Sequence, residues 1–300
     1  MALSPPDPIG HPRVAVVTVS FGSSSVLGPF LSSIPSAAVT ESPLVVVADN
    51  RVDESEHLDS LVSRAGARYL PLASNLGYGG AVNAATRELP SSVDWILVSN
   101  PDVVLGEGAI DILVREGDAD ETVGAIGPAV LTGVEGAVYP SARSVPSLRT
   151  GIGHALFANL WPSNPWSRAY RRDSDDTPLR RDAGWLSGAC LLVRRRVFDD
   201  LGGFDPSFFM YFEDVDLGYR IGKAGYRNVY EPSATAVHTG AHSTTTDSQR
   251  MIDAHHESAR QFMHKKYPGA LLWPVRAALT VGLRVRAAVV GRRTFGEPHH

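Results

Sequence analysis

Apolar, β-branched runs alternate with segments of helical pattern over the first third of the chain, and this alternation limits the fold more than any other feature. The run RVAVVTVS at 13–20 is nearly continuous, as expected of a strand buried on both faces of a sheet. The same patterns predict three further strands, at 43–49, 67–72 and 94–100, and three helices, at 25–34, 54–65 and 81–89. Such alternation predicts an α/β fold with a doubly wound sheet, whose ligands bind at the carboxyl ends of its strands.

The second half of the chain is less regular. A strand is expected at 123–130, but residues 140–182 contain many Pro, Arg and Trp residues with little periodicity. A long segment of this kind is usually a functional loop or a disordered one. Order resumes with the apolar run at 185–193, short strands are expected near 227–238, and a helix is expected at 247–266.

The chain is expected to divide into a globular domain at 1–245 and a basic helical segment at 246–300. The Pro-rich residues 1–12 are expected to be disordered, and they lack the apolar core of a secretory signal peptide. The single cysteine, Cys190, excludes an intramolecular disulfide framework and fits a reducing compartment. These features predict a cytoplasmic protein.

Positive charge is concentrated near the C-terminus. Residues 260–296 contain eight Lys or Arg and no Asp or Glu, whereas the rest of the chain contains 20 basic and 32 acidic residues. A basic segment on an acidic body predicts an anionic partner. A membrane surface fits better than nucleic acid, because the segment lacks a basic surface interleaved with aromatic residues.

The apolar segment at 271–290, LLWPVRAALTVGLRVRAAVV, resembles a membrane span only at first sight. Arg276, Arg284 and Arg286 leave no apolar run close to the roughly 20 residues that a span requires. On a helical wheel most of the arginines lie opposite an apolar face, as in helices that lie on a membrane surface. The alternative, a helix packed on the domain with its arginines in water, stays open.

Polar side chains stand at the carboxyl ends of the predicted strands, where an α/β sheet binds its ligands. An acid at the end of the second strand often bonds a nucleoside. The sequence NLGYGGAVNAA at 75–85 adds three glycines before a helix, where backbone N–H groups can approach a phosphate or a sugar, although a plain turn is an equal alternative. The residues at the strand ends are Thr18, Ser20, Asp49, Asn50, Asn100 and Asp102.

The Asn-Pro-Asp sequence at 100–102 suggests a metal site. A carboxylate such as Asp102 at the end of a buried strand suits a hard divalent cation that bridges to a diphosphate. The alternative is an Asx-Pro turn with no ligand. His238 ends a late strand, and it would become a second metal ligand if it lay beside Asp102, although a lone histidine is more often structural.

The stretch FFMYFEDVDLGYR at 208–220 places three acids beside an aromatic run. We expect Asp216 to pair with Arg220 one helical turn later. Glu213 and Asp214 are then expected at the first turn, where the helix dipole favours anions. A carboxylate half-buried by aromatic side chains near that dipole is a candidate general base.

Taken together, these motifs resemble the bacterial family-2 glycosyltransferases, enzymes of the GT-A fold that use nucleotide-diphosphate sugars. The resemblance spans residues 13–245 and is carried by VVTVS, VVVADN, NLGYGGAVNAA, SNPD and WLSGACLLVRRRVFDDLGGFDPSFFMYFEDVDLGYRIGKAGY. The GGFD…FMYFEDVDL block is similar to the rhamnosyltransferase branch. The resemblance implies a Rossmann-like nucleotide-binding sheet flanked by helices, a mixed sheet in the second half and a C-terminal helical appendage.

Residue by residue, the resemblance implies that Asp214 is the catalytic base and that Glu213 adds supporting charge. Asp102 would be the main metal ligand, because Asn100 stands where the family has its first acid, and His238 matches a late histidine presented to the metal or diphosphate. The implied donor-binding residues are Thr18, Ser20, Asp49, Asn50, Gly79, Asn83 and Asn100.

The implied reaction is an inverting transfer of L-rhamnose from dTDP-rhamnose to a hydroxyl of polyprenyl-diphosphate-linked N-acetylglucosamine in the synthesis of the cell-wall arabinogalactan linker, with Mg²⁺ or Mn²⁺ as cofactor. A lipid-linked acceptor implies that the enzyme acts at the inner face of the plasma membrane. The basic C-terminus is expected to contact that membrane peripherally, and residues 140–182 to contact the acceptor. The sequence does not determine the oligomeric state, and a homo-oligomer stays one of the options.

Three other interpretations compete. Transfer of another nucleotide sugar into a surface polysaccharide would use the same site. A sugar nucleotidyltransferase would need Lys or Arg in a glycine-rich loop after the first strand, and residues 20–28 contain neither. A non-catalytic relative that binds carbohydrate or lipid would have no use for the acids Asp102 and Asp214.

Overall fold

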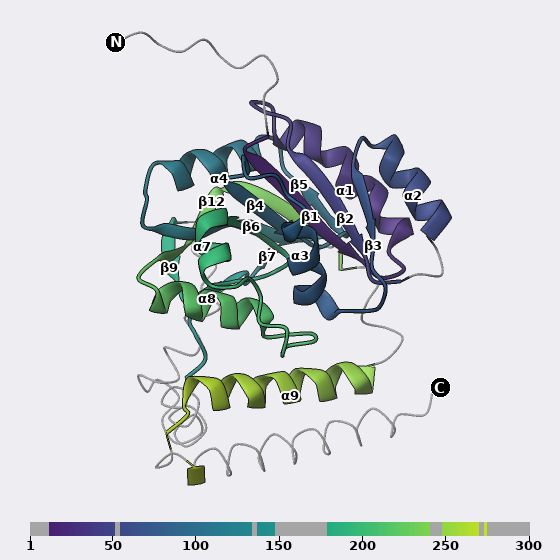
Figure 1. The fold of residues 1–300 in the computed structure, drawn as a ribbon. Helices are drawn as coiled ribbons and strands as arrows, with labels where there is room; N and C mark the ends of the chain where they lie inside the picture. The colour runs from purple at the N-terminus through teal and green to yellow at the C-terminus, as the bar shows by residue number, and fades with distance from the viewer. Residues whose placement is uncertain are drawn as a thin grey trace, which may run out of the picture.

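The computed structural model describes residues 12–51, 55–133, 137–147, 179–240, 248–269 and 273–274. A ten-stranded mixed sheet lies at the centre of the described part, with helices on both of its faces (Figure 1). The strands follow the order β3-β2-β1-β4-β11-β6-β12-β5, with β7 paired to β6 and β9 paired to β12.

The first half of the sheet is parallel, as the sequence predicts. Its strands are β1 (Val14–Ser20), β2 (Leu44–Asp49), β3 (Arg68–Pro71) and β4 (Trp95–Ser99). The helices that connect them are α1 (Ser24–Ala37), α2 (Ser55–Arg64) and α3 (Gly77–Arg87). Helix α3 begins four residues before the predicted start, so the glycines of the 75–85 sequence form its first turn rather than a loop before it.

The second half of the sheet is mixed. Strand β11 runs antiparallel to β4 and β6, whereas β12 is parallel to β6 and antiparallel to β5. A separate two-stranded sheet pairs β8 with β10. The elements are β5 (Val103–Leu105), α4 (Ala109–Asp118), β6 (Val123–Thr132), β7 (Val138–Tyr139), β8 (Ala142–Arg143), β9 (Arg181–Ala183), β10 (Trp185–Leu186), β11 (Cys190–Arg194), α7 (Arg195–Asp200), α8 (Glu213–Lys223), β12 (Arg227–His238) and α9 (Ser248–Lys266).

The apolar run at 185–193 is divided between β10 and β11 by a turn at 187–189. One sequence prediction for this half needs correction. The short strands expected at 227–238 are one strand, β12, whose pairing with β6 is irregular between Glu231 and Thr235. The irregularity accommodates Pro232, which cannot donate to a regular ladder.

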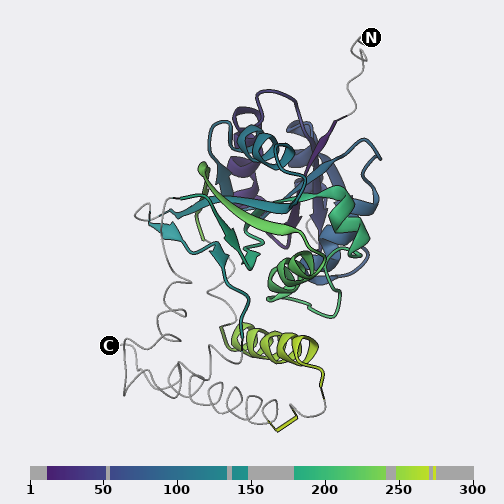
Figure 2. The same cartoon turned by 90° about the vertical axis from the view of Figure 1, so that its left-hand side faces the viewer.

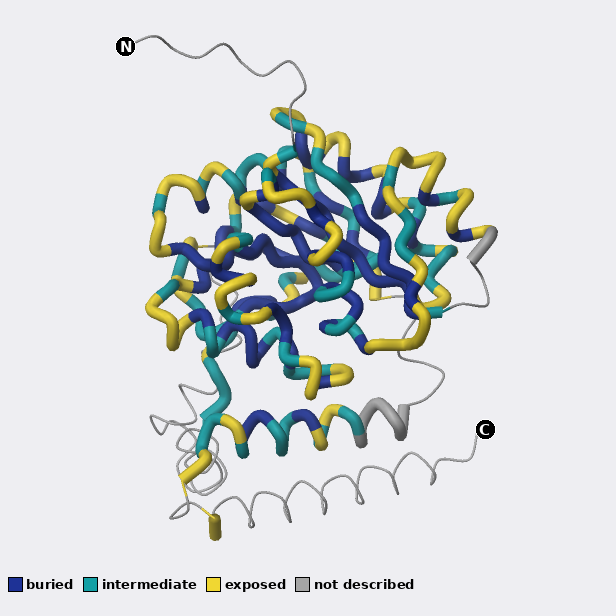
Figure 3. The backbone as a smooth tube through the Cα atoms, viewed as in Figure 1, coloured by how far each residue is buried: buried dark blue, intermediate teal, exposed yellow. Residues whose placement is uncertain are grey.

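The central sheet is buried on both faces (Figure 3). Side chains alternate along β1: Val14 and Val16 join the core beneath α1, α2 and α4, whereas Ala15 and Val17 join the core beneath α3, α7 and α8. The nearly continuous apolar sequence of the strand follows from this double burial.

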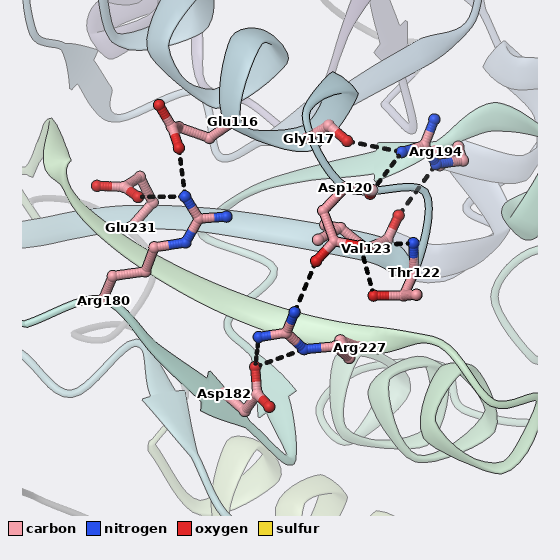
Figure 4. Close-up of polar contacts among 10 residues, drawn as sticks. All are labelled: Glu116, Gly117, Asp120, Thr122, Val123, Arg180, Asp182, Arg194, Arg227 and Glu231. Carbon is pink, nitrogen blue, oxygen red and sulfur yellow. Dashed lines mark hydrogen bonds and ion pairs between the residues drawn. The ribbon is translucent and has the colours of Figure 1, made fainter.

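Ion pairs fix the edge strand β9 to the body (Figure 4). Arg180 contacts Glu116 of α4 and lies 3.5 Å from Glu231 of β12. Arg227 lies 2.7 Å from Asp120 and 2.6 Å from Asp182 of β9. These pairs place the chain where it re-enters the described structure after 178.

Helix α9 lies beneath α8 in both views (Figures 1 and 2). In the part of the chain that the structure describes, no helix is long and apolar enough to cross a membrane. Residues 1–11 and 148–178, and 271–290 apart from 273–274, lie outside the described residues. The predicted disordered N-terminus, acceptor loop and membrane-surface helix therefore stay predictions.

Candidate active site

The carboxyl ends of β1 and β2 bring the predicted nucleotide-binding residues together. Ser20 pairs with Asp49 in the parallel register, and both are buried, as is Thr18. The Thr18 hydroxyl has no hydrogen-bond partner among the described residues. Asp49 accepts hydrogen bonds from the Tyr69 hydroxyl at 2.8 Å and from the backbone N–H of Arg51 at 3.1 Å. Burial and the carboxylate of Asp49 both raise the pKa of Tyr69, so the phenol stays a donor to Asp49.

The side chain of Asn50 holds the turn that begins α3. Its Nδ2 donates to the Gly77 carbonyl at 3.0 Å, and its Oδ1 accepts from the Leu76 N–H at 3.1 Å. Gly77 has φ +71°, and a Cβ there would lie 2.1 Å from the carbonyl oxygen of Phe209. Only glycine permits this approach of the two loops. Asn50 thus positions the turn at 75–77, and its direct contact with a donor stays a prediction.

Gly79 and Asn83 face the protein interior. A Cβ on Gly79 would lie 2.8 Å from the Cβ of Phe204. The amide of Asn83 bonds both backbone groups of Phe204, at 2.7 Å and 2.9 Å. These contacts fix α3 against the segment that leads to α8, and the predicted donor contacts of both residues stay untested.

The structure brings Asn100, Asp102 and His238 together. The antiparallel pairing of β12 with β5 places His238 opposite Val103. Its Nε2 lies 3.1 Å from Oδ1 of Asp102 and 3.4 Å from Nδ2 of Asn100. The condition under which His238 would become a second metal ligand is therefore met, and its role as a ligand stays a prediction.

This group fits a six-coordinate cation. Neighbouring ligands of an octahedral ion with bonds of about 2.1 Å are about 3.0 Å apart, which is close to the separation of the Asp102 and His238 atoms. Among the described residues, no group of three or more His, Cys, Asp or Glu could hold a metal. Asp102 and His238 would therefore supply only part of a coordination shell, and a diphosphate and water would complete it.

A strained turn leads into α8 and its acids. Tyr211 and Phe212 both have φ +67°, which is uncommon for residues other than glycine. Such residues persist only where their surroundings hold them, and they are concentrated at functional sites. The turn places Glu213 and Asp214 in the first turn of α8, as predicted.

Asp214 is held by backbone N–H groups. Its Oδ2 accepts from Gly188 at 2.9 Å and its Oδ1 accepts from Val215 at 2.8 Å. Burial raises the pKa of Asp214, while these two hydrogen bonds and the positive charge of Arg143 act in the opposite direction. The pKa of Asp214 is thus raised overall, and these contacts limit the increase.

Glu213 differs from its neighbour. It is 7% exposed, and its Oε2 has no hydrogen-bond partner in the part of the chain that the structure describes. Burial, followed by repulsion from Asp214, raises the pKa of Glu213 to about 8. The raised pKa favours the protonated form of Glu213 near neutral pH, which would leave the negative charge of the pair on Asp214. The supporting role of Glu213 stays a prediction.

The turn between β10 and β11 links the acid pair to the candidate metal group. Gly188 donates to Asp214 and accepts from the Tyr78 hydroxyl at 2.7 Å. The next residue, Ala189, accepts from the N–H of Asn100 at 2.9 Å. The candidate base and the candidate cation-binding group are thus fixed to adjacent residues of one turn, an arrangement that suits transfer from a diphosphate-linked substrate.

Sequence reasoning missed several residues of this arrangement. Tyr78 and Gly188 act through contacts between segments that are far apart in the chain, and no local pattern marks them. The pair of Asp216 and Arg220 was predicted and is confirmed at 2.6 Å. Its third member, Lys265 of α9, lies 2.6 Å from the other oxygen of Asp216 and was not predicted.

Comparison with known proteins identifies the family. The family model described as "Glycosyltransferase like family 2" matches residues 11–261. The chain belongs to glycosyltransferase family 2. This confirms the predicted family and the prediction of a glycosyltransferase.

Two relatives of this family-2 glycosyltransferase are rhamnosyltransferases by name. The N-acetylglucosaminyl-diphospho-decaprenol L-rhamnosyltransferase of Mycobacterium tuberculosis is 42% identical over 290 residues, which cover 93% of each chain. The rhamnosyltransferase WbbL of Escherichia coli is 26% identical over 84% of this chain and 93% of its own length. The predicted resemblance to the rhamnosyltransferase branch is confirmed.

Solved structures share the fold. The mannosyltransferase PcManGT from Pyrobaculum calidifontis, in complex with GDP-Man and Mn²⁺, aligns with a TM-score of 0.56 at 17% identity and covers 98% of this chain and 79% of its own. GalNAc-T7 with UDP, GalNAc and Mn²⁺ aligns with a TM-score of 0.58 at 13% identity and covers 84% of this chain and 48% of its own. The predicted GT-A fold is confirmed.

Proposed function

We propose that the chain transfers L-rhamnose from dTDP-rhamnose to N-acetylglucosamine carried on a polyprenyl diphosphate. The observation that carries the proposal is the 42% identity, over 93% of both chains, to the M. tuberculosis enzyme whose name states this reaction class and acceptor. The buried acid pair and the Asp102–His238 group supply the base and the cation-binding site that such a transfer needs.

In the proposed mechanism Asp214 removes the proton from the acceptor hydroxyl. The acceptor oxygen forms a bond to the anomeric carbon as the bond from that carbon to the diphosphate oxygen breaks, with inversion. The proton ends on Asp214, and dTDP departs as an anion. The N–H groups of Gly188 and Val215 hold the carboxylate in place for this role.

We assign the divalent cation, Mg²⁺ or Mn²⁺, to Asp102 and His238, with Asn100 beside them. When bound, the cation neutralises charge on the diphosphate leaving group. Asp49, Thr18 and Ser20 line the nucleotide end of the same sheet edge in this proposal. Carboxylate and imidazole ligands admit either metal.

An exposed apolar patch supports a lipid-linked acceptor. Leu76 is 41% exposed and Phe209 is 51% exposed, and Met210 beside Phe209 is also exposed. The two loops that carry them are joined by a hydrogen bond from the Tyr78 N–H to the Phe209 carbonyl at 3.2 Å. Phe209 and Met210 lie in the segment of chain that leads directly to Asp214, so a polyprenyl chain or a membrane surface there would bring the acceptor sugar towards the base. This supports peripheral membrane association.

The test is a transfer assay with purified full-length protein, labelled dTDP-rhamnose and polyprenyl-diphosphate N-acetylglucosamine. We expect a labelled lipid product that requires both substrates and a divalent cation. UDP- and GDP-sugars serve as competing donors in parallel reactions. Product from one of those donors but not from dTDP-rhamnose would replace the proposed donor, and no product from any donor would contradict the transferase function.

A further inference from the structure

We propose that α9 is a positioning element of the active site, in which Lys265 and Ser258 hold the loop at 205–212 and so fix the catalytic base. The inference rests on the proposed role of Asp214. It assigns to α9 a function within the catalytic domain, whereas the sequence placed this helix in a separate basic segment for membrane contact.

The central contact is a bridge made by one lysine. Nζ of Lys265 lies 2.6 Å from Oδ2 of Asp205 and 2.6 Å from Oδ1 of Asp216. Asp205 begins the loop, and Asp216 lies in the first turn of α8 just after the base. The cation therefore ties together both ends of the segment that carries Glu213 and Asp214.

The burial and charge of the two carboxylates that Lys265 contacts agree with a specific role for this lysine. Burial alone would raise the pKa of Asp205, but hydrogen bonds from Lys265 and Ser207 lower it to about 2. Asp216 is fully buried, and its other oxygen accepts from Arg220 at 2.6 Å. Removal of the lysine charge would leave a buried carboxylate with one cation instead of two, which is an unfavourable state.

Other residues of α9 also contact the loop at 205–212 and the start of α8. The Ser258 hydroxyl donates to the carbonyl of Met210 at 2.9 Å. Phe262 and Met263 of α9 are buried in one apolar cluster with Phe208 and Val215, which lie on either side of the acid pair. Three successive turns of α9 thus contact the loop and the start of α8.

The loop needs such support because its backbone is strained. Tyr211 and Phe212 adopt the left-handed conformation directly before the acid pair. A strained turn relaxes when the contacts that hold it are removed. Relaxation here would move the start of α8, and with it Asp214, away from the N–H of Gly188. Displacement of a base by about 1 Å is sufficient to cost a large part of the rate.

The test compares Lys265→Met, Lys265→Arg and Ser258→Ala in the full-length chain, with Arg260→Gln as matched control. Arg260 is a basic residue of the same helix, and it pairs with Glu257 of that helix. We expect Lys265→Met to lower kcat by about tenfold or more while the KM for the donor stays within about twofold. Lys265→Arg should recover most of the loss, Ser258→Ala should lower kcat less than Lys265→Met does, and Arg260→Gln should behave as the wild type.

Two readouts separate positioning from a general loss of folding or of the proposed activity. Donor-induced thermal stabilisation should be retained in Lys265→Met, because the nucleotide end of the sheet is formed by other elements. Amide hydrogen exchange at 206–216 should become faster in that variant whichever sugar is transferred. An unchanged kcat, an equal loss of donor affinity, or unchanged exchange at 206–216 would each overturn the proposal.

Discussion

Substitution of the two adjacent acids tests which of them carries the negative charge. In Glu213→Gln the amide replaces a carboxyl that is already protonated near neutral pH, so we expect kcat at pH 7 to stay within about threefold of the wild type. Asp214→Asn removes the proton acceptor, and we expect kcat to fall by about 10²–10⁴-fold. The two variants differ by one position in the same helical turn, and each serves as the control for the other.

The raised pKa also predicts a change in stability with pH. Glu213 has a folded pKa of about 8 against an ordinary value of 4.5, so between these values the folded state binds more protons than the unfolded state. The free energy of unfolding therefore falls as the pH rises through this window. From pH 5 to pH 8 the contribution of this single group is about 3 kcal/mol, taking about 1.4 kcal/mol for each pKa unit.

Chemical denaturation of the wild type and Glu213→Gln at pH 5, 6, 7 and 8 measures this contribution. The difference in unfolding free energy between the two proteins should change by about 3 kcal/mol across the series, because all other titrating groups are shared. Glu107→Gln, at an exposed glutamate, should leave the pH dependence unchanged. A constant difference between wild type and Glu213→Gln, together with an inactive Glu213→Gln and an active Asp214→Asn, would show that the roles are reversed.

The candidate metal and lipid sites give two further predictions. Asp102→Ala should raise the concentration of Mg²⁺ or Mn²⁺ needed for half-maximal activity by about tenfold or more, and His238→Ala should raise it less. Metal titration of turnover measures both effects. An unchanged metal dependence in both variants would contradict the assigned metal site. Phe209→Ser should raise the KM for a long-chain polyprenyl acceptor several-fold but leave the KM for a short-chain analogue unchanged. The control Val39→Ser, at another exposed apolar residue, should change neither KM. Equal effects of Phe209→Ser on both acceptors would contradict a lipid contact at Phe209.

The strands could be predicted because their burial on two faces leaves a direct mark on the sequence. β1, β2 and β4 lie within one residue of their predicted bounds. The start of α3 could not be found, because glycines disfavour a helix locally, and tertiary contacts such as those of Gly77 with Phe209 and of Gly79 with Phe204 explain them. The continuity of β12 was missed for a similar reason, since Pro232 indicates a break that the sheet accommodates by an irregular pairing.

The candidate site shows the same limit. Asp102, Asp49 and His238 could be proposed because strand ends in an α/β sheet meet at one edge, which is a rule of topology. The different protonation of Glu213 and Asp214 could not be predicted from the sequence. It depends on which side chain accepts a hydrogen bond from the N–H of Gly188 and which lies in an apolar environment. The contact between Lys265 and Asp216 likewise depends on how α9 packs, and no spacing in the sequence encodes it.

Two glycines one turn apart in α8 provide a matched test of how the base is supported. A Cβ on Gly218 would lie 2.5 Å from the Cβ and 2.7 Å from the Cα of Trp185 in β10, whereas a Cβ on Gly222 would meet nothing within 4 Å. Gly218→Ala must therefore push α8 away from β10. We expect this to lower the unfolding free energy by about 1–3 kcal/mol, whereas Gly222→Ala should raise it by up to about 1 kcal/mol, because alanine favours a helix.

The same displacement should reach the active site. β10 continues into the turn that presents the N–H of Gly188 to Asp214, so a shift of Trp185 lengthens that hydrogen bond. We expect Gly218→Ala to reduce kcat severalfold under conditions where it remains folded, and Gly222→Ala to retain full activity. Denaturation curves and turnover of the two variants check both statements. A Gly218→Ala protein as stable and active as the wild type would mean that the close packing of α8 on β10 is not what holds the base.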